Sequence, residues 1–284
     1  MERTASFLAG FVAILIATSS ANAGLVYLDD TNGDLFAGNP VTGVYTYIGT
    51  STRAAIFDGF TDIAFTTNGN LYGLDPSGLL YEINPANGHI INEGGTNNSI
   101  GTTGISNGSL VGLAADGNTL WAGGTNAVYT LNTSTGAATA VGSNTGTAYA
   151  TEGDLEFVNG VLYLTSTGDS GGDFFTVNTT TGVGTFIGNL GESQVFGLAY
   201  DTGDSTLYGY TATGLQFTIN PMTGAVSNVM TITVDGGEDP ISMSNEILGA
   251  SFGSSVPEPG SFGLLLTGMS ALAIGGALAR RRGA

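Results

Sequence analysis

The sequence lacks cysteine and lysine altogether, and it contains a single histidine, His89. Without cysteine, the chain forms no disulfide, no iron–sulfur cluster and no thiolate zinc site. Without lysine, it has no Schiff-base nucleophile and no Gly-Lys-Ser/Thr phosphate loop. His89 directly follows the turn glycine Gly88. We therefore interpret it as a solvated turn residue and not as the base of a nucleophilic triad, and we expect no catalytic residue of that kind.

Positive charge is also scarce, since five arginines stand against 23 acidic residues and give a net charge of −18. This balance opposes binding to nucleic acid, which requires a basic surface. The hydrophobic share of 42% and the charged share of 10% argue against a disordered chain. The 47 glycines among 284 residues are typical of many short strands joined by tight turns, so we expect an all-β protein.

Residues 1–23 have the three parts of a secretory signal. Arg3 supplies the positive start, residues 7–16 are mostly apolar, and Ala21-Asn22-Ala23 is a small-x-small cleavage site. The apolar run is too short to span a bilayer. We expect signal peptidase to cleave here, so that the mature protein begins near Gly24.

The other end, residues 254–284, has a different tripartite pattern. Val256-Pro257-Glu258-Pro259 precedes an apolar stretch over residues 261–279, which is followed at once by Arg280, Arg281 and Arg282. As a helix this stretch is ~28 Å long, enough to cross the hydrocarbon core of a membrane. The arginines place the tail in the cytoplasm and the main body outside, by the positive-inside rule.

Residues 256–259, which we call the box, resemble the PEP-CTERM sorting signal of Gram-negative bacteria when taken together with the apolar helix and the basic tail. That resemblance implies processing at the box by a membrane transpeptidase called exosortase, in hosts that usually make exopolysaccharide. It also implies export through the inner membrane, transient anchoring there by the tail, and a final place at the cell surface or outside the cell. The same segment is also labelled the C-terminal domain of ice-binding proteins, which concerns the tail alone.

Between these ends, one short phrase occurs five times at intervals of 42 to 48 residues. It begins with Asn, continues with Pro or Thr and ends with Gly, which is turn chemistry. Its members are residues 39–43, 84–88, 132–136, 178–182 and 220–224. Further glycines usually follow six residues after the turn, at Gly49, Gly94, Gly142 and Gly188. Each turn is preceded by two aromatic positions, which we interpret as packing residues between repeats: Tyr27, Phe36, Tyr72, Tyr81, Trp121, Tyr129, Tyr163, Phe175, Tyr208 and Phe217.

A further strand precedes four of the units, and its counterpart for the first unit stands at the far end of the chain. These strands are residues 62–65, 112–115, 154–157, 197–200 and 249–252. Repeats of about 45 residues with four strands each are typical of β-propeller blades. We predict a five-bladed β-propeller over residues 24–253, with twenty strands and a C-terminal strand that closes the first blade. The region is similar to quinoprotein-like and other repeat propellers.

Carboxylates are the remaining candidates for chemistry. Glu152, Asp154 and Glu156 alternate along one predicted inner strand and so share a face. Residues at the same place in other blades are Asp58, Asp62, Glu192 and Glu246. Such a ring of acids would suit Ca²⁺ or an acid–base pair for glycoside hydrolysis, but we favour a solvated acidic rim. Asp30-Thr-Asn-Gly-Asp34 begins like a calcium loop, although Asn32-Gly33 favours a hairpin turn.

Two functions from different classes fit these features. The first is an exported, non-enzymatic surface or matrix protein whose propeller binds a partner, with polysaccharide suggested by the family association. The second is a secreted carbohydrate-active hydrolase or lyase with Ca²⁺ as its cofactor. It uses these carboxylates, because the inner strands of a propeller line its central channel. Residues 24–256 carry 21 acidic residues and one arginine, Arg53, so this region repels polyanions.

Overall fold

The computed structural model describes residues 24–51, 59–91, 98–106, 109–125, 127–142, 149, 151–166, 172–235 and 246–253. These residues form 21 β-strands and no α-helix. Among them, no helix is long and apolar enough to cross a membrane. The signal sequence predicted over residues 1–23 and the membrane helix predicted over residues 261–279 lie outside the described residues.

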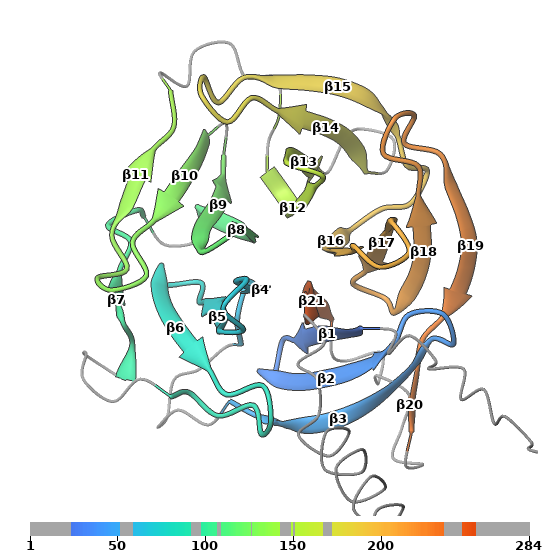
Figure 1. Ribbon diagram of the computed structural model, residues 1–284, viewed down its shortest axis with the longest axis horizontal. Helices are drawn as coiled ribbons and strands as arrows, with labels where there is room; N and C mark the ends of the chain where they lie inside the picture. Colours follow the sequence, from blue (N-terminus) through green and yellow to red (C-terminus); the bar gives the residue numbers. More distant parts are fainter. Residues whose placement is uncertain are drawn as a thin grey trace, which may run out of the picture.

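The strands form five antiparallel sheets arranged as blades around a common centre (Figure 1). Blade 1 contains β21 (Ile247–Gly253), β1 (Leu25–Asp30), β2 (Asp34–Asn39), β3 (Val44–Thr50) and β20 (Thr233–Asp235). Blade 2 contains β4 (Asp62–Phe65), β5 (Leu71–Leu74), β6 (Leu79–Ile83) and β7 (Gly101–Thr102). Blade 3 contains β8 (Leu110–Asp116), β9 (Thr119–Gly124), β10 (Ala127–Leu131) and β11 (Ala138–Ala140). Blade 4 contains β12 (Thr151–Val158), β13 (Val161–Ser166), β14 (Asp173–Val177) and β15 (Gly184–Asn189). Blade 5 contains β16 (Val195–Asp201), β17 (Thr206–Thr211), β18 (Leu215–Ile219) and β19 (Val226–Thr231).

Blade 1 joins the two ends of the described chain, as the sequence predicted. The C-terminal strand β21 pairs antiparallel with β1, so that Tyr27 lies opposite Ser251. The chain also closes the ring at its outer edge, because β20 pairs parallel with β3 and places Val234 opposite Tyr45. The five blades and the closing strand are therefore confirmed, whereas β20 is a twenty-first strand that the repeat pattern did not indicate.

The junction between blades 5 and 1 has a buried polar cluster of its own. The Tyr45 hydroxyl on β3 lies 2.9 Å from the Tyr210 hydroxyl on β17. It also donates a hydrogen bond of 2.8 Å to Oε1 of Gln216 on β18. All three side chains are almost fully buried. Because these groups have lost their water, each depends on its partners across the junction.

The five repeated turns have one structure. In each, the glycine N–H donates to the carbonyl of the asparagine four residues earlier, and the asparagine Oδ1 accepts the N–H of the residue two positions on. The glycines adopt φ between 67° and 77°, which an L-residue adopts only with strain. The repeat is therefore a turn motif that needs asparagine at its start and glycine at its end.

These turns also hold the blades together at the outer rim. A Cβ on Gly101 would lie 2.1 Å from the Thr135 carbonyl oxygen in the turn of the next blade, and one on Gly49 would lie 2.1 Å from the Asn87 carbonyl oxygen. The outer glycines thus let each turn pack directly on the preceding blade. In blade 2 the equivalent contact is made by Gly101 on β7, and Gly94 lies outside the described residues.

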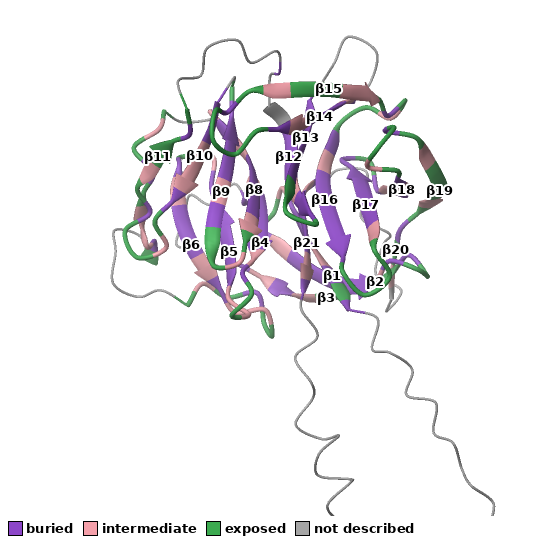
Figure 2. Ribbon diagram, turned by 45° about the horizontal axis from the view of Figure 1, so that its top comes forward, coloured by how far each residue is buried: buried purple, intermediate pink, exposed green. Residues whose placement is uncertain are grey.

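The core lies between the blades, with the inner strands mostly buried and the outer edges exposed (Figure 2). Seven of the ten repeated aromatics are buried, and Tyr27, Trp121 and Tyr129 are half-buried. Two of these pack across blade junctions: Tyr27 lies 4.9 Å from Phe65 and Trp121 lies 5.6 Å from Phe157, between ring centroids. The packing role predicted for the aromatics is confirmed.

Candidate functional site

The five inner strands β4, β8, β12, β16 and β21 surround the centre of the ring (Figure 1). Each contributes one residue at an equivalent position near its start. These residues are Asp62, Gly112, Asp154, Gly197 and Gly249. The two carboxyl groups and the three glycines therefore belong to one layer of the structure, and the sequence-predicted site residues Asp62 and Asp154 do meet in it.

Both aspartates are fully buried and act as acceptors for backbone N–H groups. Asp62 accepts from Ile63 on its own strand at 2.7 Å and from Leu113 on the next blade at 2.5 Å. Asp154 does the same with Leu155 and Leu198, both at 2.5 Å. Inner strands have one edge without a ladder partner, so their N–H groups need other acceptors. The carboxylates supply these acceptors and thereby join neighbouring blades.

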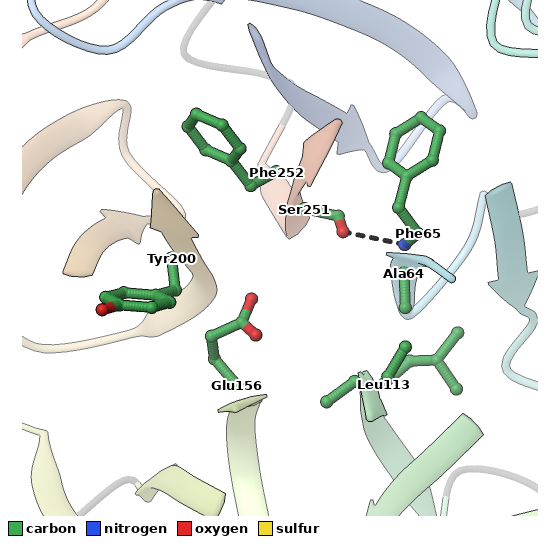
Figure 3. Close-up of a pocket in the computed structure, with 9 residues that line it drawn as sticks. Ala64, Phe65, Leu113, Glu156, Tyr200, Ser251 and Phe252 are labelled. Atoms are coloured by element: carbon green, nitrogen blue, oxygen red, sulfur yellow. Dashed lines mark hydrogen bonds between the residues drawn. The ribbon is translucent and has the colours of Figure 1, made fainter. Parts of the chain in front are cut away.

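A second layer repeats this arrangement two residues further along the strands. Glu156 accepts hydrogen bonds from the N–H groups of Phe157, at 2.7 Å, and Tyr200. Ser251 accepts one from Phe65 at 2.9 Å. These side chains face a small polar cavity of about 60 Å³ inside the ring, and the Glu156 carboxylate points into it (Figure 3). Asp154 and Glu156 thus share the channel face, as their alternation predicted.

The two junctions without such a bridge are packed through glycine. A Cβ on Gly112 would lie 2.5 Å from Cδ1 of Leu155, and one on Gly197 would lie 2.8 Å from Cβ of Ala250. Glycine is therefore required where inner strands approach most closely. Among the inner strands, side-chain oxygens bridge the junctions between blades 1 and 2, 2 and 3, and 4 and 5, whereas the inner strands pack directly at the other two junctions.

A third aspartate belongs to this centre, and the sequence analysis missed it. Asp29 on β1 is buried, and neither of its carboxyl oxygens has a hydrogen-bond partner among the described residues. It lies opposite Gly249 in the ladder between β1 and β21. A Cβ on Gly249 would lie 2.5 Å from Oδ1 of Asp29 and 2.3 Å from Oδ1 of Asp62. The Asp29 carboxyl thus lies beside the backbone of β21, close to Asp62.

The site is electrostatically unbalanced, because the described residues include no lysine or arginine. Burial raises the pKa of Asp29 well above its ordinary value, and the charges of Asp30 and Asp154 raise it further. Burial, followed by the charge and hydrogen bond of Asp154, raises the pKa of Asp62. Burial raises the pKa of Asp154 to about 7, against its hydrogen bond with Asp62. Burial and Asp154 raise the pKa of Glu156. The pKa of each of these four carboxyl groups is therefore raised above that of a solvated carboxyl group.

The interpretation of these acids as a solvated rim is wrong for Asp62 and Asp154, because both are fully buried. Glu192 is half-buried and Glu246 exposed, in the loops that precede β16 and β21. Asp58 lies outside the described residues, as do the sorting residues Val256, Pro257, Glu258, Pro259, Arg280, Arg281 and Arg282 and the cleavage residues Ala21 and Ala23. Glu152 belongs to β12, but its side chain is also outside the described set.

The described carboxylates do not form an evident calcium cage. In the part of the chain described, no three histidine, aspartate or glutamate side chains are grouped so as to hold a metal ion. The Asp30–Asp34 segment forms the hairpin between β1 and β2, with Oδ1 of Asp30 accepting the N–H groups of Asn32 and Asp34 and with Gly33 at φ 76°. The hairpin interpretation is confirmed there, and the calcium site at the channel stays a prediction.

The arrangement of Asp62 and Asp154 also differs from that of a glycosidase pair. Glycosidases keep two carboxyl groups about 5–9.5 Å apart in a cleft that the sugar enters. Here the two carboxyl groups share a hydrogen bond and are fully buried, and each also accepts two backbone N–H groups. They are arranged to hold the inner strands. His89, the other titratable candidate, is exposed in its turn, as predicted.

One end of the channel opens into an apolar depression of about 160 Å³. It is lined by the residues that directly precede the layer of aspartates and glycines on four inner strands. These are Thr61, Val111, Phe196 and Leu248, all half-buried. We call this depression the apolar mouth. It is a concave surface to which blades 1, 2, 3 and 5 each contribute one residue.

No family model and no curated protein matches the chain. Among solved structures, it is similar to BamB from Moraxella catarrhalis, at 20% identity and a TM-score of 0.33, over 74% of this chain and 62% of that one. It is also similar to the extracellular domain of the putative hybrid two component system BT4673 from B. thetaiotaomicron, at 19% identity and a TM-score of 0.41, over 73% of this chain and 28% of that one. The computationally designed Ika8 protein matches at 12% identity and a TM-score of 0.38, over 78% and 67%. These values are too low for the neighbours to inform the function of this chain.

Proposed function

We propose that this chain is an exported, non-enzymatic surface or matrix protein whose propeller is a rigid binding module. One observation carries this proposal above all. The carboxyl groups that sequence reasoning offered as catalysts are buried in the ring and accept backbone N–H groups of neighbouring blades. These carboxyl groups stabilise the fold, so we place the binding site on the outside of the ring. The apolar mouth is the best-formed surface there.

On this proposal, the C-terminal sorting tail directs the module to the place where it works. The Val256–Pro259 box begins three residues after the end of β21, so the ring follows the tail to the membrane and then to its final place. On this proposal, signal peptidase removes residues 1–23 and an exosortase-type transpeptidase processes the box. The protein is anchored in the inner membrane by residues 261–279 in between, and afterwards stays at the cell surface or in the extracellular matrix.

The charge and shape of the ring narrow the class of partner. A region with 21 acidic residues and one arginine repels anionic polymers. An uncharged polysaccharide avoids this repulsion, and apolar and aromatic side chains suit the faces of sugar rings. Phe196 is the aromatic residue of the apolar mouth. We therefore propose neutral exopolysaccharide as the ligand and the apolar mouth as its site.

Affinity electrophoresis of the full-length protein, in a non-ionic detergent without a sugar headgroup, tests this proposal. Gels that contain a neutral polysaccharide should retard the protein, and gels that contain an anionic one should not. Phe196→Ala should abolish the retardation. Phe186→Ala is the matched control, because Phe186 lies 55% exposed on the outer strand β15, away from the mouth. Equal loss in both variants, or retardation only by the anionic polymer, would contradict the proposal.

A further inference from the structure

The three aspartates meet where the chain closes its ring. Strand β21 lies between β1, with which it forms a ladder, and the inner strands of the two neighbouring blades, β4 and β16. Gly249 of β21 is flanked by Asp29 from β1 and by Asp62 from β4. The closing strand therefore passes between two buried carboxyl groups, and its own residue at that point has no side chain to separate them.

No cation balances these groups among the described residues. The titratable side chains that face them are Asp30 on β1 together with Asp154 and Glu156 on β12. In the described parts of β21, β8 and β16, no titratable group lies at this level, since Asp116 and Asp201 stand at the far ends of β8 and β16. Every charge that acts on the cluster is therefore negative.

Asp29 differs from the other two aspartates in its contacts. Asp62 and Asp154 each accept two backbone N–H groups, which favour a carboxylate. Asp29 is 1% exposed and has no partner for either oxygen in the described part of the chain. A buried neutral carboxyl is tolerated at moderate cost, whereas a buried carboxylate without a partner is not. The charge on Asp29 therefore opposes the closed arrangement directly.

We propose that Asp29 is a proton-operated latch for the closing strand. With a proton, it lets β21 pack between β1 and β4 and complete blade 1. Without one, it is a buried charge that has no hydrogen-bond partner in the described part of the chain and lies against the backbone of Gly249, so β21 moves away from the ring. The strand can respond locally, because it is the last described element of the chain and can leave without unpairing blades 2 to 5. This inference does not depend on the proposed polysaccharide function.

Hydrogen exchange measured by mass spectrometry tests the latch on the full-length protein in detergent, with a chelator present. Exchange rates are corrected for their intrinsic dependence on pH. The opening constant of β21 should rise by up to about tenfold per pH unit while one proton is lost, reaching its highest value at alkaline pH. Strand β17 in blade 5 should not show this rise. A rise of equal size in β17, or none in β21, would overturn the proposal.

Two variants separate the latch from general effects of charge. Asp29→Asn keeps the shape of the protonated side chain and cannot ionise, so β21 should stay protected at alkaline pH. Asp116→Asn removes an exposed charge on β8 and should keep the wild-type rise. If both variants behave alike, the latch is refuted. If Asp29→Asn fails to fold, the comparison of β21 with β17 in the wild-type chain still decides the question.

Discussion

The carboxylate of Asp154 accepts the backbone N–H of Leu198 at 2.5 Å across the junction between blades 4 and 5. The same oxygen-to-amide bridge occurs from Asp62 to Leu113 between blades 2 and 3. Both aspartates stand on inner strands that have no ladder with each other. The inner ring is thus held by side chains that replace the missing ladder bonds, and several measurable consequences arise from this arrangement.

Replacing Asp154 with alanine should destabilise the protein strongly. The N–H groups of Leu155 and Leu198 would lose their acceptor while they remain buried, at about 1–3 kcal/mol each. Urea unfolding of the full-length protein gives the free energy of unfolding for this comparison. Asp116→Ala, at an exposed position, should leave that free energy nearly unchanged. An equally small loss in both variants would show that the bridge contributes little.

The Tyr45 hydroxyl should stabilise the junction between blades 5 and 1. Tyr45→Phe removes its bonds to Tyr210 and Gln216 in a buried site and should cost about 1–3 kcal/mol. Tyr47→Phe is the matched control on the same strand, because Tyr47 is 48% exposed. Thermal unfolding of both variants should place only Tyr45→Phe well below the wild type, and the reverse order would contradict this account.

The outer rim should depend on close approach and not only on turn conformation. Gly136 and Gly160 have similar φ values of 77° and 80°, so alanine at either pays a similar conformational cost. Only at Gly136 would the new Cβ meet a neighbouring blade, 2.5 Å from the Gly101 carbonyl oxygen. We expect Gly136→Ala to lose about 1–3 kcal/mol more than Gly160→Ala in urea unfolding. Equal losses would mean that the contact between blades is unimportant.

The proposed sorting tail makes a prediction in cells. Pro257→Ala with Pro259→Ala should block processing at the box, so the unprocessed protein should accumulate in the inner-membrane fraction. An alanine pair placed in the exposed turn, at Thr179 and Thr180, should leave processing intact. Immunoblots of fractionated cells report both outcomes. Normal release of the proline variant would contradict exosortase-type sorting.

The sequence predicted the fold well, because the repeated Asn-to-Gly turn and the displaced strand at residues 249–252 are local signals. It also placed Asp62 and Asp154 in one layer, since the repeat supplies their register. Asp29 was missed because it belongs to another strand and approaches Asp62 only once β1 pairs with β21. Strand β20 was missed for a similar reason, since parallel pairing with the distant strand β3 leaves no periodic signal. The expectation of solvated acids was wrong for Asp62 and Asp154, because an alternating pattern does not show that neighbouring blades bury these side chains.

The central claim is that the channel carboxyl groups are structural parts of the ring whose pKa values folding raises, and the dependence of stability on pH tests it most directly. Folding raises the pKa of Asp154 from 3.8 to about 7 and raises those of Asp29, Asp62 and Glu156. Their contribution to stability is therefore complete below the unfolded values and is lost as the pH rises through the folded ones, by about 1.4 kcal/mol per pH unit for each proton. Thermal unfolding of the full-length protein should be recorded from acid to alkaline pH, with chelator and with millimolar Ca²⁺. The account predicts a midpoint that falls as the pH rises through neutrality and that is the same with and without Ca²⁺. A midpoint that rises with pH would contradict it. A large upward shift of the midpoint with Ca²⁺ at neutral pH would also contradict it and would identify the carboxylates as a metal site.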